Sequence, residues 1–183
     1  MSATAPAGRP DASEYAPYYE RYVSQIEGDV LETLERQGAQ TLALLGGISE
    51  AAAGSRYEPG KWSVKELVGH MIDGERIFAY RALRFARGDA TPLPGFDQDP
   101  YVAAGNFDAR TLSSLAEEFR HVRASTLALF RGLDAEAWSR GGTASDNPVT
   151  VRAIAYIIAG HEAHHVGDLR ERYLRGHGQR PQS

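Results

Sequence analysis

The sequence predicts an all-α fold, a four-helix bundle, and three observations support this class. Apolar residues recur at helical spacing through four segments of about 20 residues, each about 30 Å long as a helix. A helix-capping residue precedes each segment. Strand patterns are unconvincing, since the β-leaning stretches 149–151 and 153–158 are short and the second continues a helical period.

The four long helices are predicted from their apolar periodicity at residues 29–48, 63–87, 108–131 and 150–174. Their expected N-terminal caps are Asp29, Ser63, Asp108 and Thr150. The first two caps belong to capping-box patterns, because Glu32 and Glu66 follow three residues later. Gly88 is the expected C′ residue, directly after the second helix.

The connecting segments differ in length and composition. Residues 15–27 carry tyrosines at helical spacing and predict a short aromatic helix or an ordered lead-in, whereas 51–61 and 132–148 are predicted to be polar loops. Residues 88–107 are predicted to be an unusually long loop, because three prolines interrupt any regular helix. A loop of this length is often functional, and it can return along the length of a helix.

Composition and charge exclude several classes of protein. The 183 residues are 42% hydrophobic and 24% charged, as in a globular domain, which is predicted here over residues 15–175. A formal charge of −4 argues against nucleic acid as a partner, and the lack of an 18-residue apolar run argues against a membrane span. No cysteine is present, which excludes disulfides, cysteine-ligated zinc, iron–sulfur clusters and a cysteine nucleophile.

The ends of the sequence lead to two further expectations. Residues 1–14 and 176–183 are expected to be flexible tails, because they are rich in small and polar residues. No signal-peptide pattern is recognised in residues 1–14, and together with the lack of cysteine this predicts a cytoplasmic location.

Two histidines one helical turn apart are the most informative residues in the sequence. The apolar positions of the last helix trace one stripe, and His161 and His165 continue it. Residues four apart lie above one another on a helix, so both imidazoles can reach one metal ion. The alternative is that both histidines fill the core with local hydrogen bonds, but each then needs its own buried partner.

A third metal ligand is predicted at His70. This histidine lies on the apolar stripe of the second helix, and Gly74 one turn later leaves open space beside its imidazole. Three histidine ligands leave one coordination position open, as catalytic metal sites do. The other histidines are expected elsewhere, with His121 on the surface, His164 at the edge of the pocket and His177 in the C-terminal tail.

Two aspartates are candidates to orient the ligands by accepting hydrogen bonds from them. Asp73 and Asp168 each follow a predicted ligand by three residues. The alternative for both carboxylates is an exposed position or an ion pair within their own helix. The levels of the histidines along their helices fit an antiparallel second and fourth helix slightly better than a parallel pair, and the 88–107 loop is long enough for the crossover this requires.

The same histidines match H-E-x-x-H, the motif of a class of zinc proteases in which Glu162 would be the general base. The surrounding sequence argues against this function. The extended motif requires glycine and histidine where this chain has Asp168 and Glu171. Only 18 residues follow His165, which leaves little room for a distant glutamate ligand, and no edge strand is evident to bind a peptide.

Two sequence motifs resemble the hallmarks of the DinB/YfiT-like proteins. The first is YEPGKWSVKELVGHMID at residues 57–73, and the second is GHEAHH at residues 160–165. Shorter similarities lie between them, LPGFDQ at 93–98 and VTVR at 149–152. The resemblance extends over residues 15–175, and the two histidine motifs together are fairly specific for this family.

The resemblance implies a fold, a metal site and a type of chemistry. The fold is a four-helix bundle in up-down-down-up order. The site is a divalent metal, with zinc or nickel expected, held by three histidines that correspond to His70, His161 and His165. Members are often dimers, which predicts a homodimer. Some relatives transfer small electrophiles to low-molecular-weight thiols such as bacillithiol or mycothiol, or use such thiols to isomerise their substrates.

Three functions are compatible with these features. The first is a metal-dependent enzyme that transfers a small electrophile to a low-molecular-weight thiol, which has to be a cosubstrate because the chain has no cysteine. The alternatives are a hydrolase that uses metal-bound hydroxide and a non-catalytic, stress-related metal-binding module. Candidates for binding the anionic groups of a cosubstrate are Arg81, Arg84 and Arg152, and the alternative for each is a solvated surface position.

Overall fold

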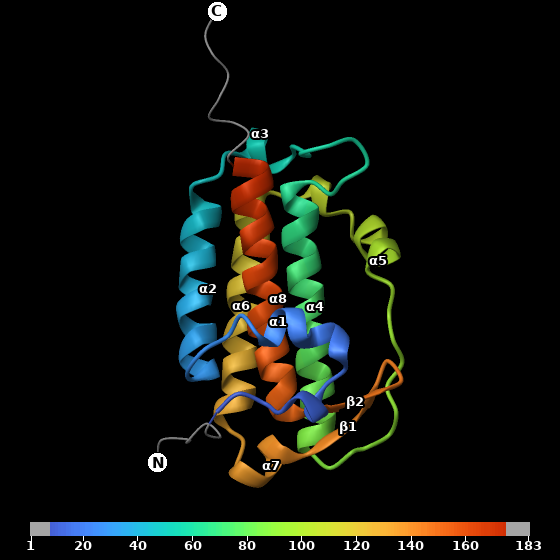
Figure 1. Ribbon diagram of the computed structural model, residues 1–183. Coiled ribbons are helices and arrows are strands. Elements are labelled where there is room, and N and C mark those ends of the chain that lie inside the picture. Colours follow the sequence, from blue (N-terminus) through green and yellow to red (C-terminus); the bar gives the residue numbers. More distant parts are fainter. Residues whose placement is uncertain (1–7, 175–183) are drawn as a thin grey trace, which may run out of the picture.

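Four long helices form the body of the protein in a computed structural model that describes residues 8–174 (Figure 1). They are α2 (Val30–Gly46), α4 (Val64–Ala86), α6 (Leu112–Arg131) and α8 (Val151–Asp168), and a short π-helix over Leu169–Leu174 extends α8. These helices lie close to the predicted spans, so the mainly helical four-helix class is confirmed. Within the described range, none of the helices has both the length and the hydropathy that a membrane span requires.

The helices are arranged in up-down-down-up order. α2 and α8 run in one direction, and α4 and α6 run in the other (Figure 1). α4 packs against α6 and α8, and α2 packs against the same two helices. Because α4 and α6 are consecutive and parallel, the chain has to cross from one end of the bundle to the other between them. Residues 87–111 provide this crossover, which confirms the predicted topology (Figure 1).

Three of the four predicted helix caps are confirmed. The Asp29 carboxylate accepts hydrogen bonds from two backbone N–H groups of α2, Ser63 belongs to a reciprocal capping box at α4, and Thr150 caps α8. The prediction for Asp108 is wrong, because Thr111 caps α6. Asp108 lies in a separate 3-10 turn before the helix, where its carboxylate accepts a hydrogen bond from the Ser63 hydroxyl at 2.5 Å.

Short elements occupy the segments that the sequence predicts to be loops. They are α3 (Glu50–Ala53), α5 (Gln98–Gly105), α7 (Ala135–Ser139) and an antiparallel hairpin of β1 (Gly141–Ala144) and β2 (Asn147–Thr150). α5 corrects the expectation that prolines exclude a helix from residues 88–107. Pro100 is the third residue of α5, where a backbone N–H has no acceptor within the helix. The hairpin corrects the expectation of no strands, because Ser145 and Asp146 both adopt positive φ and form the two-residue turn that joins the strands.

The N-terminal segment lies across the bundle and contains α1 (Glu20–Val23), preceded by 3-10 turns over Ala12–Glu14 and Pro17–Tyr19. α1 packs against α8 (Figure 1). Gly160 of α8 permits this contact, because a Cβ there would lie 2.2 Å from the Tyr22 carbonyl oxygen.

Ordered structure begins before the predicted domain boundary at residue 15. The Glu14 carboxylate accepts hydrogen bonds from the Thr150 hydroxyl at 2.7 Å and from Arg152 Nε at 3.1 Å. These contacts attach the end of the predicted tail to the start of α8. Residues 1–7 and 175–183, which include His177, lie outside the described range.

Two apolar clusters fill the bundle, and a polar layer lies between them. Along α8 the first cluster ends at Ala159 and the second begins at Val166, and along α4 the change falls between Ile72 and Phe78. The buried polar residues in or beside this layer are Thr41, His70, Glu75, Arg123, Thr126, His161, Glu162 and His165. His161 and His165 therefore lie where the apolar pattern of α8 is interrupted, and His70 contacts them from α4.

Candidate metal centre

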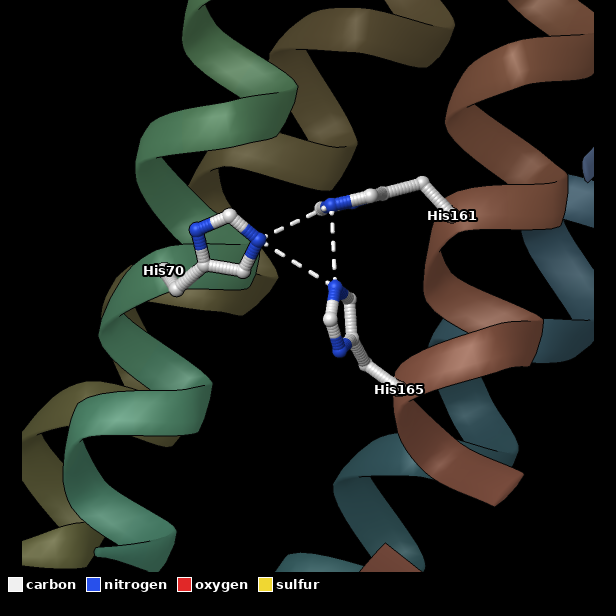
Figure 2. Close-up of side chains that lie close together, drawn as sticks. All are labelled: His70, His161 and His165. Atoms are coloured by element: carbon white, nitrogen blue, oxygen red, sulfur yellow. Dashed lines mark hydrogen bonds between the residues drawn. The ribbon is translucent and has the colours of Figure 1, made fainter. Parts of the chain in front are cut away.

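Three histidine side chains converge from two helices that are far apart in the sequence. His70 comes from α4, and His161 and His165 come from successive turns of the antiparallel helix α8 (Figure 2). Their Nε2 atoms form a triangle with edges of 3.0 Å (His70–His161), 3.2 Å (His70–His165) and 3.1 Å (His161–His165). The fold thus brings together the three residues predicted as ligands.

The three Nε2 atoms cannot all satisfy one another by hydrogen bonding. In a neutral imidazole one ring nitrogen carries the hydrogen and the other accepts, so each Nε2 is either a donor or an acceptor. In a triangle of three such atoms, at least one pair is therefore of the same kind. Three lone pairs that face one point instead suit a metal ion, because nitrogen ligands of a tetrahedral zinc lie about 3.3–3.4 Å apart. The observed edges are close to this value, so the donor set fits a divalent metal.

Burial keeps the three imidazoles neutral. Each residue is less than a tenth exposed. Loss of hydration lowers the pKa of His70 to about 4, the pKa of His165 to about 3, and the pKa of His161 well below its usual value. Neighbouring imidazoles lower the pKa values of His161 and His165 further, because positively charged rings would repel each other. The neutral ring is the form that binds metal, so protons do not compete for the site at neutral pH.

Close packing around the rings explains Trp62 of the first histidine motif and Gly74, which directly follows that motif. A Cβ at Gly74 would lie 3.0 Å from the Cε1 atom of His161, so glycine leaves room for that ring. The sequence predicts open space beside His70 at this position, and the space is filled by His161 of the opposite helix. Trp62 packs against the His70 ring with a centroid separation of 4.9 Å. These contacts limit the movement of both rings.

The two aspartates predicted to orient the ligands have other neighbours. Asp168 pairs with Arg172 at 2.9 Å and lies 3.6 Å from His164 Nε2. It accepts no hydrogen bond from His165, whose Nδ1 atom is buried and lacks a partner among residues 8–174. Asp73 lies near charged residues at the contact between α4 and α6, and burial raises its pKa. The expected orienting role is therefore not seen for Asp168.

Two pockets lead to the histidine cluster. The first, of about 390 Å³, is lined by His70 and His161 together with aromatic side chains. The second, of about 290 Å³, is lined by His165. Gln98 lines the first pocket and its neighbour Asp99 lines the second, so the start of α5 lies between them. Small molecules can thus approach the histidines by two routes.

The three arginines predicted to bind an anionic cosubstrate are used within the fold. The Arg81 guanidinium is buried and donates from Nη2 to the Pro94 carbonyl oxygen at 2.8 Å and to the Ser145 hydroxyl at 3.1 Å. Arg84 and Arg152 are paired with carboxylates. None of the three is among the described residues that line the two pockets, and their binding of a cosubstrate stays a prediction.

A buried ion cluster, which the sequence analysis does not anticipate, lies in the same polar layer. Arg123 of α6 donates to both carboxylate oxygens of Glu75 on α4, at 2.9 and 2.7 Å, and to the Leu34 carbonyl of α2 at 2.8 Å. Its Nη1 atom lies 2.7 Å from a carboxylate oxygen of Glu162 on α8. Thr41 of α2 donates to the other oxygen of Glu162 at 2.6 Å. The signal in the sequence is Arg123 itself, an arginine at an apolar-stripe position of its helix.

The position of Glu162 contradicts the zinc-protease alternative. Its carboxylate is directed at Arg123 and Thr41, and burial raises its pKa. Neither pocket at the histidine cluster has Glu162 among its described lining residues. A general base has to face the substrate, whereas this glutamate contacts other side chains inside the bundle.

The remaining described histidines lie apart from the Nε2 triangle. His121 is exposed, as predicted, on a groove between α4 and α6. His164 packs against the Tyr22 ring and, with His165 and Asp168, forms a second group of possible metal donors. Unlike the triangle, this second group is partly exposed.

Comparison with known protein families shows to which family the chain belongs. The sequence profile of the DinB superfamily matches residues 33–169, which include all three histidines of the cluster. The chain belongs to the DinB superfamily. This membership confirms the resemblance carried by the two histidine motifs. No curated protein sequence matches the chain.

Solved structures with the DinB-superfamily fold resemble the whole bundle. YfiT from Bacillus subtilis, described as a probable metal-dependent hydrolase with an unusual four-helix bundle topology, has a TM-score of 0.71 at 17% identity over 82% of this chain and 87% of its own. The mycothiol-dependent maleylpyruvate isomerase has a TM-score of 0.63 at 18% identity over 80% and 65%. The DinB-like protein YjoA from Bacillus subtilis has a TM-score of 0.59 at 22% identity over 85% and 96%. At these identities the similarity establishes the shared fold.

Proposed function

We propose that the protein is a divalent-metal-dependent enzyme that transfers a small electrophile to a low-molecular-weight thiol. The observation that carries this proposal is the convergence of three histidine Nε2 atoms, 3.0–3.2 Å apart, at a point reached by two pockets. Three protein ligands leave a coordination position for a further ligand. The thiol has to come from outside the chain, which has no cysteine, and one solved relative depends on the thiol mycothiol.

In this proposal His70, His161 and His165 hold the metal, with zinc or nickel expected from their nitrogen donors. A divalent metal bound there would favour the thiolate form of a thiol that coordinates it. The chain supplies the geometry, because the antiparallel helices α4 and α8 hold the three Nε2 atoms within 3.0–3.2 Å of one another. Burial keeps the rings neutral, and Trp62 and Gly74 restrict their positions.

A hydrolase is the second candidate, and the similarity to YfiT, described as a probable metal-dependent hydrolase, favours it. The same three-histidine site would serve this chemistry, since a metal with an open position can activate water. A third candidate, a non-catalytic metal-binding module, requires no exchangeable ligand at the metal. The homodimer and the cytoplasmic location inferred from the sequence stay predictions.

Cobalt substitution separates these candidates, because a thiolate bound to cobalt adds an intense charge-transfer band in the near ultraviolet. The chain has no cysteine, so such a band has to come from an added thiol. We expect the band with 2-mercaptoethanol, no band with its S-methyl derivative, and no band in His161→Ala. If cobalt binds but no thiol produces the band, the transferase proposal fails and the hydrolase or the module replaces it.

A further inference from the structure

The two pockets at the histidine cluster differ in the chemistry of their walls. The first pocket is lined by five aromatic side chains, Tyr18, Tyr19, Tyr22, Phe78 and Phe96. They come from three segments that only the fold brings together: the N-terminal segment, α4 and the crossover. The ring centroids of Tyr18 and Tyr19 lie 5.3 Å apart, and those of Tyr19 and Phe78 lie 6.1 Å apart, both edge to face. Walls of this kind suit a planar ring.

The fixed charges around the first pocket have both signs. Apart from the histidines, Asp97 is the one ionisable acid or base with a full charge among the described lining residues. Arg81, behind the wall, is buried and already donates to the Pro94 carbonyl and the Ser145 hydroxyl. The Arg81 guanidinium carbon lies 5.9 Å from the ring centroids of Phe78 and Phe96, and that of Arg21 lies 4.2 Å from the Tyr18 ring centroid, so the aromatic walls, rather than a net charge, distinguish this pocket.

The second pocket presents charges of both signs. Lys61 and Asp99 lie on its walls, and neither forms an ion pair with another described residue. The only other lysine in the sequence, Lys65, pairs with Glu50 at 2.9 Å. A free cation and a free carboxylate on one pocket match a small thiol that carries both a carboxylate and an ammonium group.

We propose that the first pocket binds the electrophile through an aromatic ring, and that the second pocket binds an amino-acid-like thiol whose carboxylate pairs with Lys61. This assignment rests on the proposed thiol transfer. The reactants then approach the histidine cluster from different pockets. The thiolate sulfur forms a bond to the electrophilic carbon of the ring-bearing substrate, and the bond from that carbon to its leaving group breaks. The leaving group departs with the electron pair, and the thiol proton passes to solvent.

Two ring amides of similar size test the first pocket, the aromatic benzamide and the saturated cyclohexanecarboxamide. Their affinities are measured by ligand-observed NMR titration of the metal-loaded protein without thiol. We expect benzamide to bind about three- to tenfold more tightly, because only its ring is planar and can pack edge to face against the aromatic walls. Tyr18→Ala should weaken benzamide binding about three- to tenfold, the range of an aromatic pair. Tyr80→Ala is the matched control, since Tyr18 and Tyr80 are 56% and 50% exposed and Tyr80 lies on the α4–α6 groove.

Equal affinities for the two ring ligands, or equal losses in Tyr18→Ala and Tyr80→Ala, would overturn the assignment of the first pocket. Both tyrosines are exposed, so neither variant is expected to unfold the protein, and circular dichroism checks this. Because the titration contains no thiol and needs no turnover, it is independent of the transferase proposal. Benzamide binding that persists while every thiol fails in the cobalt experiment would show that the proposed function alone is wrong.

N-acetylcysteine and its amide test the second pocket on the cobalt-substituted protein. Both carry the same thiol, and only the first carries a carboxylate. We expect N-acetylcysteine to half-saturate the charge-transfer band at about two- to fivefold lower concentration, the range of an exposed ion pair. Lys61→Met should remove this difference, and Lys65→Met should retain it. Equal half-saturation in the parent protein, or a difference that survives Lys61→Met, would overturn the assignment.

Discussion

The polar layer of the bundle contains two clusters whose polar atoms are satisfied in different ways. In the ion cluster, Arg123 lies within 2.9 Å of carboxylate oxygens of both Glu75 and Glu162, so opposite charges meet inside the protein. In the histidine cluster, three neutral rings direct Nε2 atoms at one another, and burial keeps them uncharged. The ion cluster is held by contacts within the protein and joins all four helices. The histidine cluster lies on two pockets, and its three nitrogen donors fit a divalent metal.

Breaking the ion cluster should have the largest effect on stability. Arg123→Met leaves Glu75 and Glu162 buried without their cation, and we expect it to lower the free energy of unfolding by about 3–5 kcal/mol. Urea unfolding measures this loss. The control is Arg131→Met, because the pair between Arg131 and Glu35 is exposed and should contribute less than about 1 kcal/mol. Similar losses in the two variants would mean that burial does not distinguish the pairs.

Breaking the histidine cluster should remove the metal and leave the fold. His161→Ala deletes one of three ligands, and we expect metal affinity to fall by more than about 100-fold, beyond the loss typical of groups that only support a ligand. Metal content after dialysis of protein made without a histidine tag measures this. His121→Ala, an exposed histidine far from the cluster, should keep the parent metal content. Equal metal in His161→Ala and the parent would refute the site.

The histidine cluster should also make the metal-free protein sensitive to acid. The pKa of His70 is lowered to about 4 in the folded protein, so between pH 6.5 and pH 4 the unfolded chain binds more protons. The free energy of unfolding therefore has its full value above pH 6.5. It decreases as the pH falls toward 4, by about 2 kcal/mol for this group. Urea unfolding at several pH values with a chelator present measures it. His70→Leu should flatten the profile, and a profile as steep as the parent's would contradict the assignment.

The smallest effect is expected where the two clusters adjoin. Glu162→Gln keeps the shape of the side chain beside His161, so metal affinity should change less than about tenfold, as for a group outside the ligands. Any turnover found for the parent should be largely retained, because Glu162 faces Arg123 and Thr41 rather than a pocket. A loss of turnover of several hundredfold with metal retained would restore the zinc-protease interpretation.

Local sequence patterns determined the helices and most of their ends. Ser63 with Glu66, Asp29 and Thr150 act within one helical turn, and Gly88 adopts a φ of 77° directly after the cap of α4. The predictions for α5 and for the hairpin were wrong, because general rules were applied without regard to the position of the residues. A proline disrupts a helix only beyond the first turn, and Pro100 lies within the first turn of α5. The two-residue turn that joins β1 to β2 contains no glycine, so the sequence lacks the usual signal for it.

The sequence by itself also determined the two ligands that share a helix face, because the four-residue spacing of His161 and His165 is a local property of α8. Only the tertiary structure decided which partners the polar side chains contact across the bundle. Glu162 of α8 contacts Arg123 of α6 and Thr41 of α2, and Arg81 of α4 ties the crossover to the hairpin. Charges attract over several ångströms in any direction, so their partners depend on which helices pack together, whereas caps and helix faces depend on neighbours along the chain.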